Sequence, residues 1–309
     1  MWRFYVWGEG GKSQNPHSTL FQSGTCGFIS AHTPPPLPPF AALHYNARTE
    51  KTMATSAPVE AKPQVKLDQI KIDICCAARI LYRQGMSAAN AGHISVAIAP
   101  DRMLMNRFGP SFATLHPNDI LALDFHGNIL EDHTAQKNAR LNETVELHGI
   151  IHRYNPHAVC VLHTHPPATV TWSTFRKVPE IYDQESCILA GDVAVVEEEY
   201  EGLASGEERT KSAALALGNK RAVILPNHGA ITTGPSAQHA LFCMLILEGM
   251  VARNLSVLSA ARATGLTPQP IKMEVAQQVR TGIAKMNALE PLWADLLHRL
   301  VQTDPELFA

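Results

Sequence analysis

The chain has 309 residues, 45% of them hydrophobic, and a formal net charge of -2 at pH 7. This apolar content is ample for the core of one large domain or two small ones. The near-neutral charge and the lack of a basic run with interleaved aromatic residues exclude a phosphate-backbone footprint, so we expect no nucleic-acid partner. The longest apolar runs, such as 240–247, fall short of the roughly 20 residues that cross a membrane, so we expect no membrane segment.

Residues 1–63 differ in composition from the rest of the chain. They are rich in Pro, Ser, Thr and Gly and show no sustained hydrophobic period, which predicts a disordered N-terminal tail. The few acidic residues are compatible with a transit peptide, although an Arg-rich amphipathic face and a secretory apolar core are both lacking. A start at Met53 would remove most of this tail, so no function is assigned to it.

The six cysteines show neither metal-ligand spacing nor the spacing of a disulfide framework. We expect them to be small buried hydrophobic residues in a reducing, cytoplasmic compartment. Only Cys187, which follows a polar segment at 183–186, is placed to approach a functional site.

The first half of the remaining chain predicts one helix and several short strands. Apolar residues recur at helical spacing from Lys66 to Gln84, and Gly85 follows as a C-terminal cap. Strands are predicted at 92–99, 103–105 and 120–124, and a turn at 126–128 leads into a short strand at 129–130.

The second half alternates strands with helices. We expect a helix at 142–154 with Asn142 as its N-cap, and then a buried strand at 158–162. The further elements expected are a strand at 192–196, a helix at 205–218, a strand at 221–225 and a helix at 236–263. This interleaving is typical of an α/β fold.

Two histidines, His163 and His165, follow the buried strand at 158–162. Alternate residues of a strand point to one face about 6.5–7 Å apart, so both imidazoles can reach a single ion. His228 comes just after the strand at 221–225, in the sequence Pro-Asn-His-Gly, and is the expected third ligand.

Three neutral imidazoles are a common ligand set for a divalent metal with an open position, which is the catalytic arrangement. Zinc is the metal we expect, with iron, manganese and cobalt as alternatives, because three imidazoles serve all four. The competing interpretation is that the His-x-His pair packs in the core or faces solvent.

Four motifs resemble those of the class II aldolase/adducin family in the order in which they occur there. They are Gly92-His93-Ile94-Ser95, the turn at 123–128, Leu147-His148 followed by 153–156 and 161–166, and 225–229. The resemblance covers about residues 66–258. It implies a three-layer α/β/α sandwich around a mixed, largely antiparallel sheet at 64–265, followed by a C-terminal helical extension at 266–309.

The same resemblance implies a homo-oligomer, commonly a tetramer, that acts on a small molecule. It assigns the metal to His163, His165 and His228, and it implies a catalytic carboxylate four residues before His148. Thr144 occupies that position, and a threonine hydroxyl cannot abstract a carbon-bound proton at neutral pH. A shift of one residue would make Glu143 the catalytic group. The competing role of Glu143 is a solvated carboxylate near a helix N-terminus.

The family's phosphate-binding positions are also altered, because they correspond to His93, Phe108-Gly109 and Asn142-Glu143. A phenyl ring and a carboxylate replace small hydroxyl donors, which predicts a non-phosphorylated substrate. Asn142, Thr144 and Gly109 remain candidates for substrate binding. Arg107 and His93 could bind a substrate carboxylate, although a solvated Arg and a histidine packed in a turn are the competing interpretations.

Tyr182 and Asp183 are further catalytic candidates. They lie in a polar stretch between the two ligand segments, which could bring a phenol or a carboxylate close to the metal. The competing interpretation is a solvated loop.

Three functions fit this sequence. The first is a metal-dependent lyase that acts by aldol cleavage or decarboxylation on a small hydroxy or oxo acid or another carbonyl compound. The second is a non-haem iron oxygenase that uses the same three histidines. The third is a non-catalytic, adducin-like interaction module, which the full set of three histidines disfavours.

Overall fold

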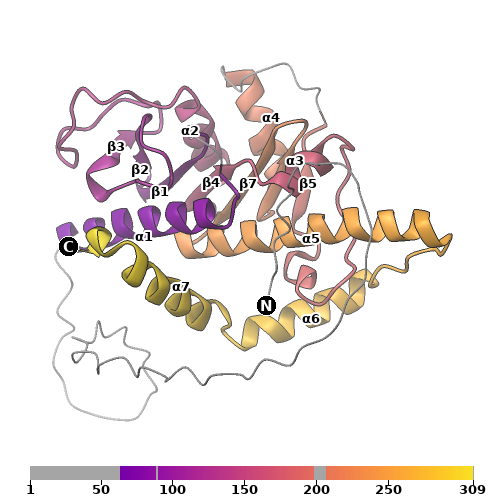
Figure 1. Ribbon diagram of the computed structural model, residues 1–309. Helices are drawn as coiled ribbons and strands as arrows, with labels where there is room; N and C mark the ends of the chain where they lie inside the picture. Colours follow the sequence, from indigo (N-terminus) through magenta and orange to yellow (C-terminus); the bar gives the residue numbers. More distant parts are fainter. Residues whose placement is uncertain (1–62, 88–89, 198–206, 309) are drawn as a thin grey trace, which may run out of the picture. The chain divides into compact units, whose positions relative to one another are not determined.

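A computed structural model describes residues 63–87, 90–197 and 207–308 (Figure 1). The predicted tail, apart from Pro63, and the alternative start at Met53 lie outside the described residues. A seven-stranded sheet has the order β3-β2-β1-β4-β7-β6-β5. Its strands are β1 (His93–Ala99), β2 (Arg102–Asn106), β3 (Ile120–Asp124), β4 (Cys160–Thr164), β5 (Val193–Val195), β6 (Ala222–Leu225) and β7 (Gly229–Gly234).

All neighbouring strands are antiparallel except β5 and β6, which are parallel. The sheet is therefore mixed and largely antiparallel, as the family resemblance implies. Because side chains alternate along a strand, each face of the sheet has its own apolar cluster. Ile94, Cys160 and Leu162 lie in one cluster, and Val161 and Ile231 lie in the other.

Helices cover both faces of the sheet, which gives the expected α/β/α sandwich (Figure 1). The face bearing Ile94 and Leu162 packs against α1 (Pro63–Arg83) and α5 (Ala237–Thr264). The face bearing Val161 packs against α2 (Val145–Tyr154) and α4 (Glu207–Leu217). A short helix, α3 (Pro167–Ser173), follows β4 directly and packs against α5.

Helix α5 is the longest described helix. Ser236 caps its N-terminus, because the Ser236 hydroxyl accepts from the His239 amide, and Gly265 ends it with a left-handed φ of 71°. Of the described helices, α5 alone is long and apolar enough by composition to cross a membrane. Its buried residues pack on the sheet and on α1, as in the core helix of a sandwich. The apolar run at 240–247 is therefore only one part of this 28-residue helix.

Two further helices lie in the predicted C-terminal extension, α6 (Met273–Lys285) and α7 (Leu289–Thr303), and a short 3-10 turn, η3 (Pro305–Phe308), follows them. Helix α7 contacts α1 and α5. Asp304, at the end of α7, forms ion pairs with Arg79 at 2.8 Å and Arg83 at 2.5 Å, both in α1. Arg79 also pairs with Glu306. These ion pairs thus connect the segment at 304–306 to α1, the first described helix.

We expect Asp304→Asn to lower the free energy of unfolding by about 3 kcal/mol, because it leaves the buried charge of Arg79 short of a partner. Burial raises the pKa of Asp304, but hydrogen bonds from Thr303, Arg79 and Arg83 outweigh burial and hold the pKa below its usual value. A depressed carboxyl pKa stabilises the fold above the unfolded pKa of about 3.9 and loses that effect as the pH falls.

Urea titrations of the wild type and Asp304→Asn at pH 7 and in the acid range measure both effects. The difference in unfolding free energy between the two proteins should shrink as the pH falls below about 4. Asp295→Asn is the matched control, because its pair with Arg299 is exposed and is worth less than about 1 kcal/mol. Equal losses in the two variants at pH 7 would contradict this account.

The structure differs from the sequence-based elements at several points. Helix α2 begins at Val145, not at Asn142, and Thr144 is its N-cap residue, without a side-chain cap hydrogen bond. Residues 129–130 form only an isolated bridge, between Ile129 and Leu123. Helix α3 and strand β7 were not predicted, because α3 is only 7 residues long and β7 is rich in Gly and Thr.

Candidate metal centre

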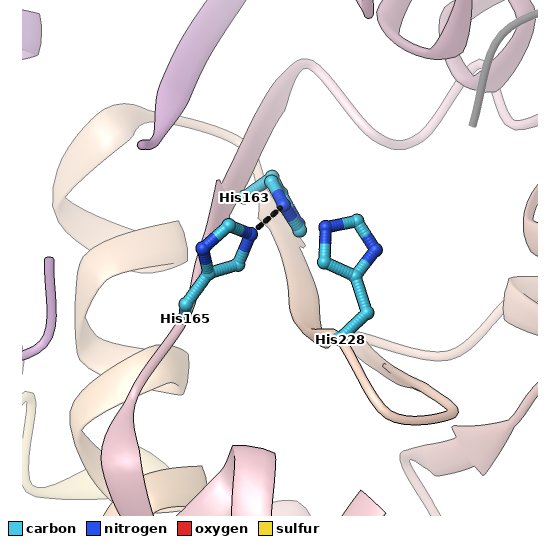
Figure 2. A group of neighbouring side chains, drawn as sticks. All are labelled: His163, His165 and His228. Atoms are coloured by element: carbon cyan, nitrogen blue, oxygen red, sulfur yellow. Dashed lines mark hydrogen bonds between the residues drawn. The ribbon is translucent and has the colours of Figure 1, made fainter. Parts of the chain in front are cut away.

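Three histidines from two adjoining parts of the sheet converge on one point (Figure 2). His163 lies in β4, His165 follows the end of that strand, and His228 lies in the turn between β6 and β7. Their candidate ligand atoms all lie within 4.8 Å of one another. His163 is buried, whereas His165 and His228 are half-buried, so the group faces outward on one side.

The hydrogen bonds of His163 leave one ring nitrogen for a metal. Its Nδ1 lies 3.0 Å from the Ala230 carbonyl oxygen, which can only accept, so Nδ1 carries the proton. Its Nε2 therefore has a lone pair, and it lies 2.9 Å from Nε2 of His165. Two ligand nitrogens that face each other at this distance fit a divalent ion with nitrogen bonds of about 2.0–2.1 Å.

The three histidines are held in the neutral form that metal ligation requires. Burial, together with the nearby histidines His93, His228 and His165, lowers the pKa of His163 well below its usual value. Burial also lowers the pKa of His165, and burial together with His165 lowers the pKa of His228 to about 4. Near pH 7 all three rings present lone pairs, so these residues fit a divalent metal.

A three-residue turn positions His228. Leu225 pairs with Gly229, and the residues between them include Asn227 at a φ of 53°. Asn is one of the few side chains that adopt this left-handed conformation readily. Next to it, Gly229 lies so close to β4 that a Cβ there would approach the Thr164 carbonyl oxygen to 2.5 Å and Cδ2 of His165 to 2.9 Å.

We expect Gly229→Ala to weaken metal binding by about 10–100-fold, because the new methyl group displaces the His165 ring. Overpacking against the β4 backbone should also lower the free energy of unfolding by about 1–3 kcal/mol. Competition with a chromophoric chelator measures the metal affinity. Gly282→Ala is the control, since a Cβ at Gly282 meets no atom within 4 Å. Unchanged metal affinity in Gly229→Ala would contradict this arrangement.

The segment after His165 is anchored by a carboxylate from α5. Glu248 accepts hydrogen bonds from the amides of Ala168 and Thr169 and from the Thr169 hydroxyl, each at 2.8 Å. These amides belong to the first turn of α3, where a helix needs acceptors for its unpaired N–H groups. The backbone just beyond His165 is therefore fixed to the core helix.

A buried row of further histidines lies beside the centre. His93 is directly opposite His163 in the β1–β4 pairing, and their rings stack with centroids 4.7 Å apart. Nδ1 of His93 lies 2.5 Å from Nε2 of His148 in α2. Burial lowers the pKa values of His93 and His148 well below the usual range, and neighbouring histidines lower them further.

Thr144 and Asn142 adjoin this row. The Thr144 hydroxyl lies 2.7 Å from Nε2 of His93 and 2.7 Å from Oδ1 of Asn142. Glu143 is exposed and lies 3.7 Å from Arg140. The structure thus brings His93, Thr144 and Asn142 together beside the three histidines, and it gives Glu143 the contacts of a solvated carboxylate.

Arg107 and Gly109 lie on the loop after β2. The Arg107 guanidinium pairs with Asp119 at 2.9 Å, and a Cβ at Gly109, whose φ is 125°, would lie 3.1 Å from that guanidinium. The Arg140 guanidinium lies over the Phe108 ring, 4.3 Å from its centroid. The charge of Arg107 is therefore already compensated within the chain.

Asp183 and Tyr182 lie in a segment that contacts α5. Asp183 accepts hydrogen bonds from the amide and hydroxyl of Ser186 and pairs with Arg253 of α5 at 2.7 Å. These contacts tie Asp183 to α5, and Tyr182 is half-buried beside it. Neither residue is joined to the three histidines by a hydrogen bond or ion pair among the described residues. Cys187 is buried, and its thiol donates to the Asp183 carbonyl.

The sequence analysis missed Ser95 and His152, which extend the row of buried histidines. Ser95 lies 2.6 Å from Nδ1 of His148 and 2.7 Å from Nε2 of His152. The signal was present, because His148 and His152 are four residues apart on a predicted helix and share one face. His93 and Ser95 are two residues apart on a predicted strand and share one face as well.

Curated relatives with named activities resemble this chain over most of its length. The 4-hydroxy-3-prenylphenylpyruvate oxygenase/4-hydroxy-3-prenylbenzoate synthase of Streptomyces roseochromogenus subsp. oscitans is 28% identical, over 71% of this chain and 76% of its own. The 3,4-dihydroxyphthalate decarboxylase of Rhodococcus jostii is 24% identical, over 64% and 84%. Alpha-adducin of Mus musculus is 24% identical over 82% of this chain, which spans 35% of that protein.

Solved structures share the fold. An L-fuculose 1-phosphate aldolase from Glaciozyma antarctica superposes with a TM-score of 0.68 at 23% identity, covering 80% of this chain and 96% of the aldolase. An aldolase II superfamily protein from Pseudomonas syringae gives a TM-score of 0.67 at 26% identity, covering 79% and 96%. The family model of the class II aldolase and adducin N-terminal domain matches residues 72–255, well over half of the chain. The chain belongs to the class II aldolase and adducin family.

Proposed function

We propose that the protein is a metal-dependent lyase that cleaves a carbon–carbon bond in a small, non-phosphorylated hydroxy or oxo acid, by decarboxylation or by aldol cleavage. The observation that carries this proposal is the convergence of His163, His165 and His228 as neutral candidate ligands, with His165 and His228 only half-buried. These residues would hold a divalent metal, which would supply a Lewis acid for substrate oxygens.

Decarboxylation is the reaction that the neighbouring residues favour. A retro-aldol cleavage begins with removal of a proton by a base, and the position expected for the carboxylate holds Thr144. Loss of carbon dioxide needs no base to begin. Support also comes from the named relatives, which include the 3,4-dihydroxyphthalate decarboxylase.

A non-phosphorylated substrate fits the surroundings of the centre. Arg107 is paired with Asp119, and Arg140 lies over Phe108, so neither guanidinium is free of partners. The exposed carboxylate of Glu143 adds negative charge where the family's phosphate-binding residues are expected. A phosphate dianion would meet repulsion there.

Release of carbon dioxide from a panel of acids tests the proposal. The panel includes 3,4-dihydroxyphthalate, simple 2-oxo acids and 2-hydroxy acids, and each acid is assayed before and after chelation. We expect turnover of at least one acid that stops on chelation and returns with added metal. Full activity after the metal has been removed, or activity confined to phosphate esters, would reject the proposal.

An oxygenase is the second candidate, because the oxygenase/synthase of Streptomyces roseochromogenus is among the relatives. Three imidazoles also suit ferrous iron. An anaerobic assay separates the two: a lyase keeps its full rate without oxygen, whereas an oxygenase loses it.

A further inference from the structure

His165 lies at the point where the chain leaves the sheet. The last pairing of β4 joins Thr164 to Ala230 of β7, and the buried Thr164 hydroxyl donates to the Met86 carbonyl at 2.5 Å. The backbone before His165 is therefore fixed by the sheet. The direction of the His165 ring then depends on how the chain is held beyond the strand.

Beyond His165, a single carboxylate holds the chain. Oε1 of Glu248 accepts from the Ala168 amide, and Oε2 accepts from both the amide and the hydroxyl of Thr169, each at 2.8 Å. Both carboxylate oxygens are thus engaged, and hydrogen bonds to an ionised acceptor are the stronger kind. Thr169 is completely buried, so water does not compete for its donors.

Two prolines make the connection between His165 and this anchor stiff. The proline ring fixes φ near -65°, and Pro166 has a φ of -65° and a ψ of 135°. A residue that precedes a proline is itself restricted to extended backbone, and both His165 and Pro166 precede one. Few dihedral angles remain to absorb a shift of the Ala168 amide, so such a shift is passed on to His165.

We propose that Glu248 is a positioning residue of the metal centre, which sets the metal affinity through the backbone of His165. Glu248 acts from the core helix α5, which supplies none of the three proposed ligands. Small changes in the orientation of a ligand matter, because residues that orient metal ligands typically change the affinity by about 10–100-fold. This inference rests on metal binding at the three histidines, as in the proposed function.

Glu248→Gln tests this role with almost no change in the size of the side chain. The amide offers one oxygen to the donors of α3, and its NH2 group then faces the remaining N–H as a second donor. We expect the metal affinity to fall by about tenfold or more. Thr169→Val is a milder variant, because it removes only the hydroxyl donor and leaves both amide bonds, so we expect a smaller loss.

Asn254 provides a matched control on the same helix. Its side chain accepts from the Glu180 amide at 2.9 Å and donates to the Glu180 carbonyl at 2.8 Å. Like Glu248, it holds the backbone of a neighbouring segment to α5, but that segment carries none of the three histidines. Asn254→Asp removes the donation to Glu180. We expect this variant to unfold at a lower urea concentration and to keep the metal affinity of the wild type.

Two measurements on the full-length proteins report on the metal. Competition with a chromophoric chelator gives the affinities, and the visible absorption of bound Co²⁺ reports the number and geometry of its ligands. We expect the Co²⁺ spectrum of Glu248→Gln to differ from that of the wild type, and the spectrum of Asn254→Asp to match it. A purely structural role of Glu248 would lower the urea midpoint and leave the spectrum unchanged.

Hydrogen exchange on the metal-free proteins tests the anchor itself. The amides of Ala168 and Thr169 should exchange faster in Glu248→Gln than in the wild type, because their acceptor is weakened. Unchanged exchange at both amides would show that Glu248 does not hold this segment, and it would overturn the inference without reference to any metal.

The metal affinities decide the rest. Equal affinities in the wild type, Glu248→Gln and Thr169→Val would overturn the role of Glu248 and leave the proposed function intact. A loss of the same size in Asn254→Asp would also overturn that role, because general destabilisation would then explain it. If Glu248→Gln does not fold, the comparison of Thr169→Val with the wild type decides. Absence of metal from the wild type would overturn the proposed function and this inference together.

Discussion

Replacing His228 with alanine should lower metal affinity by more than about 100-fold and abolish turnover. His228 is one of the three proposed ligands, and with two imidazoles left the protein would supply too few bonds to hold the ion against water. The fold should survive, because His228 is half-buried in a turn whose conformation depends on Asn227 and Gly229. Metal titration and thermal unfolding of the same sample separate the two effects.

The control for this prediction is another histidine. His298 lies on α7, where its ring contacts Gln302 on the exposed side of the helix. His298→Ala should keep the metal affinity and activity of the wild type. Retention of full metal affinity by His228→Ala would remove His228 from the ligand set.

Gly149→Ala should cost about 3 kcal/mol of unfolding free energy or prevent folding altogether. A Cβ at Gly149 would lie 1.8 Å from the Phe125 carbonyl oxygen and 2.7 Å from its carbon, and a backbone carbonyl cannot move aside as a flexible side chain can. Helix α2 must then shift away from the end of β3. His148 and His152 are on this helix, so the hydrogen bonds of the histidine row should weaken as well.

Gly249→Ala is the matched comparison, since Gly249 also lies inside a helix but a Cβ there meets no atom within 4 Å. Helix propensity alone should stabilise this variant by about 0.5–1 kcal/mol. Chemical denaturation of both variants measures the difference. If Gly149→Ala unfolds like the wild type, α2 does not pack as closely as the structure shows.

The convergence of the three histidines could be foreseen because it depends on local rules. Strand alternation places His163 and His165 on one side, and a Pro-Asn-His-Gly turn after a strand places His228 at the same edge. The pairing of β4 with β7, which joins the two segments, could not be foreseen. Strand β7 begins with Gly229 and contains two threonines, so its apolar pattern is weak.

The residues around the histidines were harder to predict because they depend on tertiary contacts. Glu143 and Thr144 differ by one position, and only the start of α2 at Val145 shows that Thr144 meets His93 while Glu143 faces outward. Asp183 could equally have reached the metal centre or α5. Its partner Arg253 is 70 residues away in sequence, and no local pattern announces that ion pair.

Elemental analysis of the full-length protein, purified without a histidine tag, tests the central claim most directly, with His163→Ala, His165→Ala and His228→Ala measured in parallel. The account predicts about one equivalent of a divalent transition metal per chain in the wild type and its loss in all three variants. Less than about half an equivalent in the wild type, with no change in the variants, would contradict it.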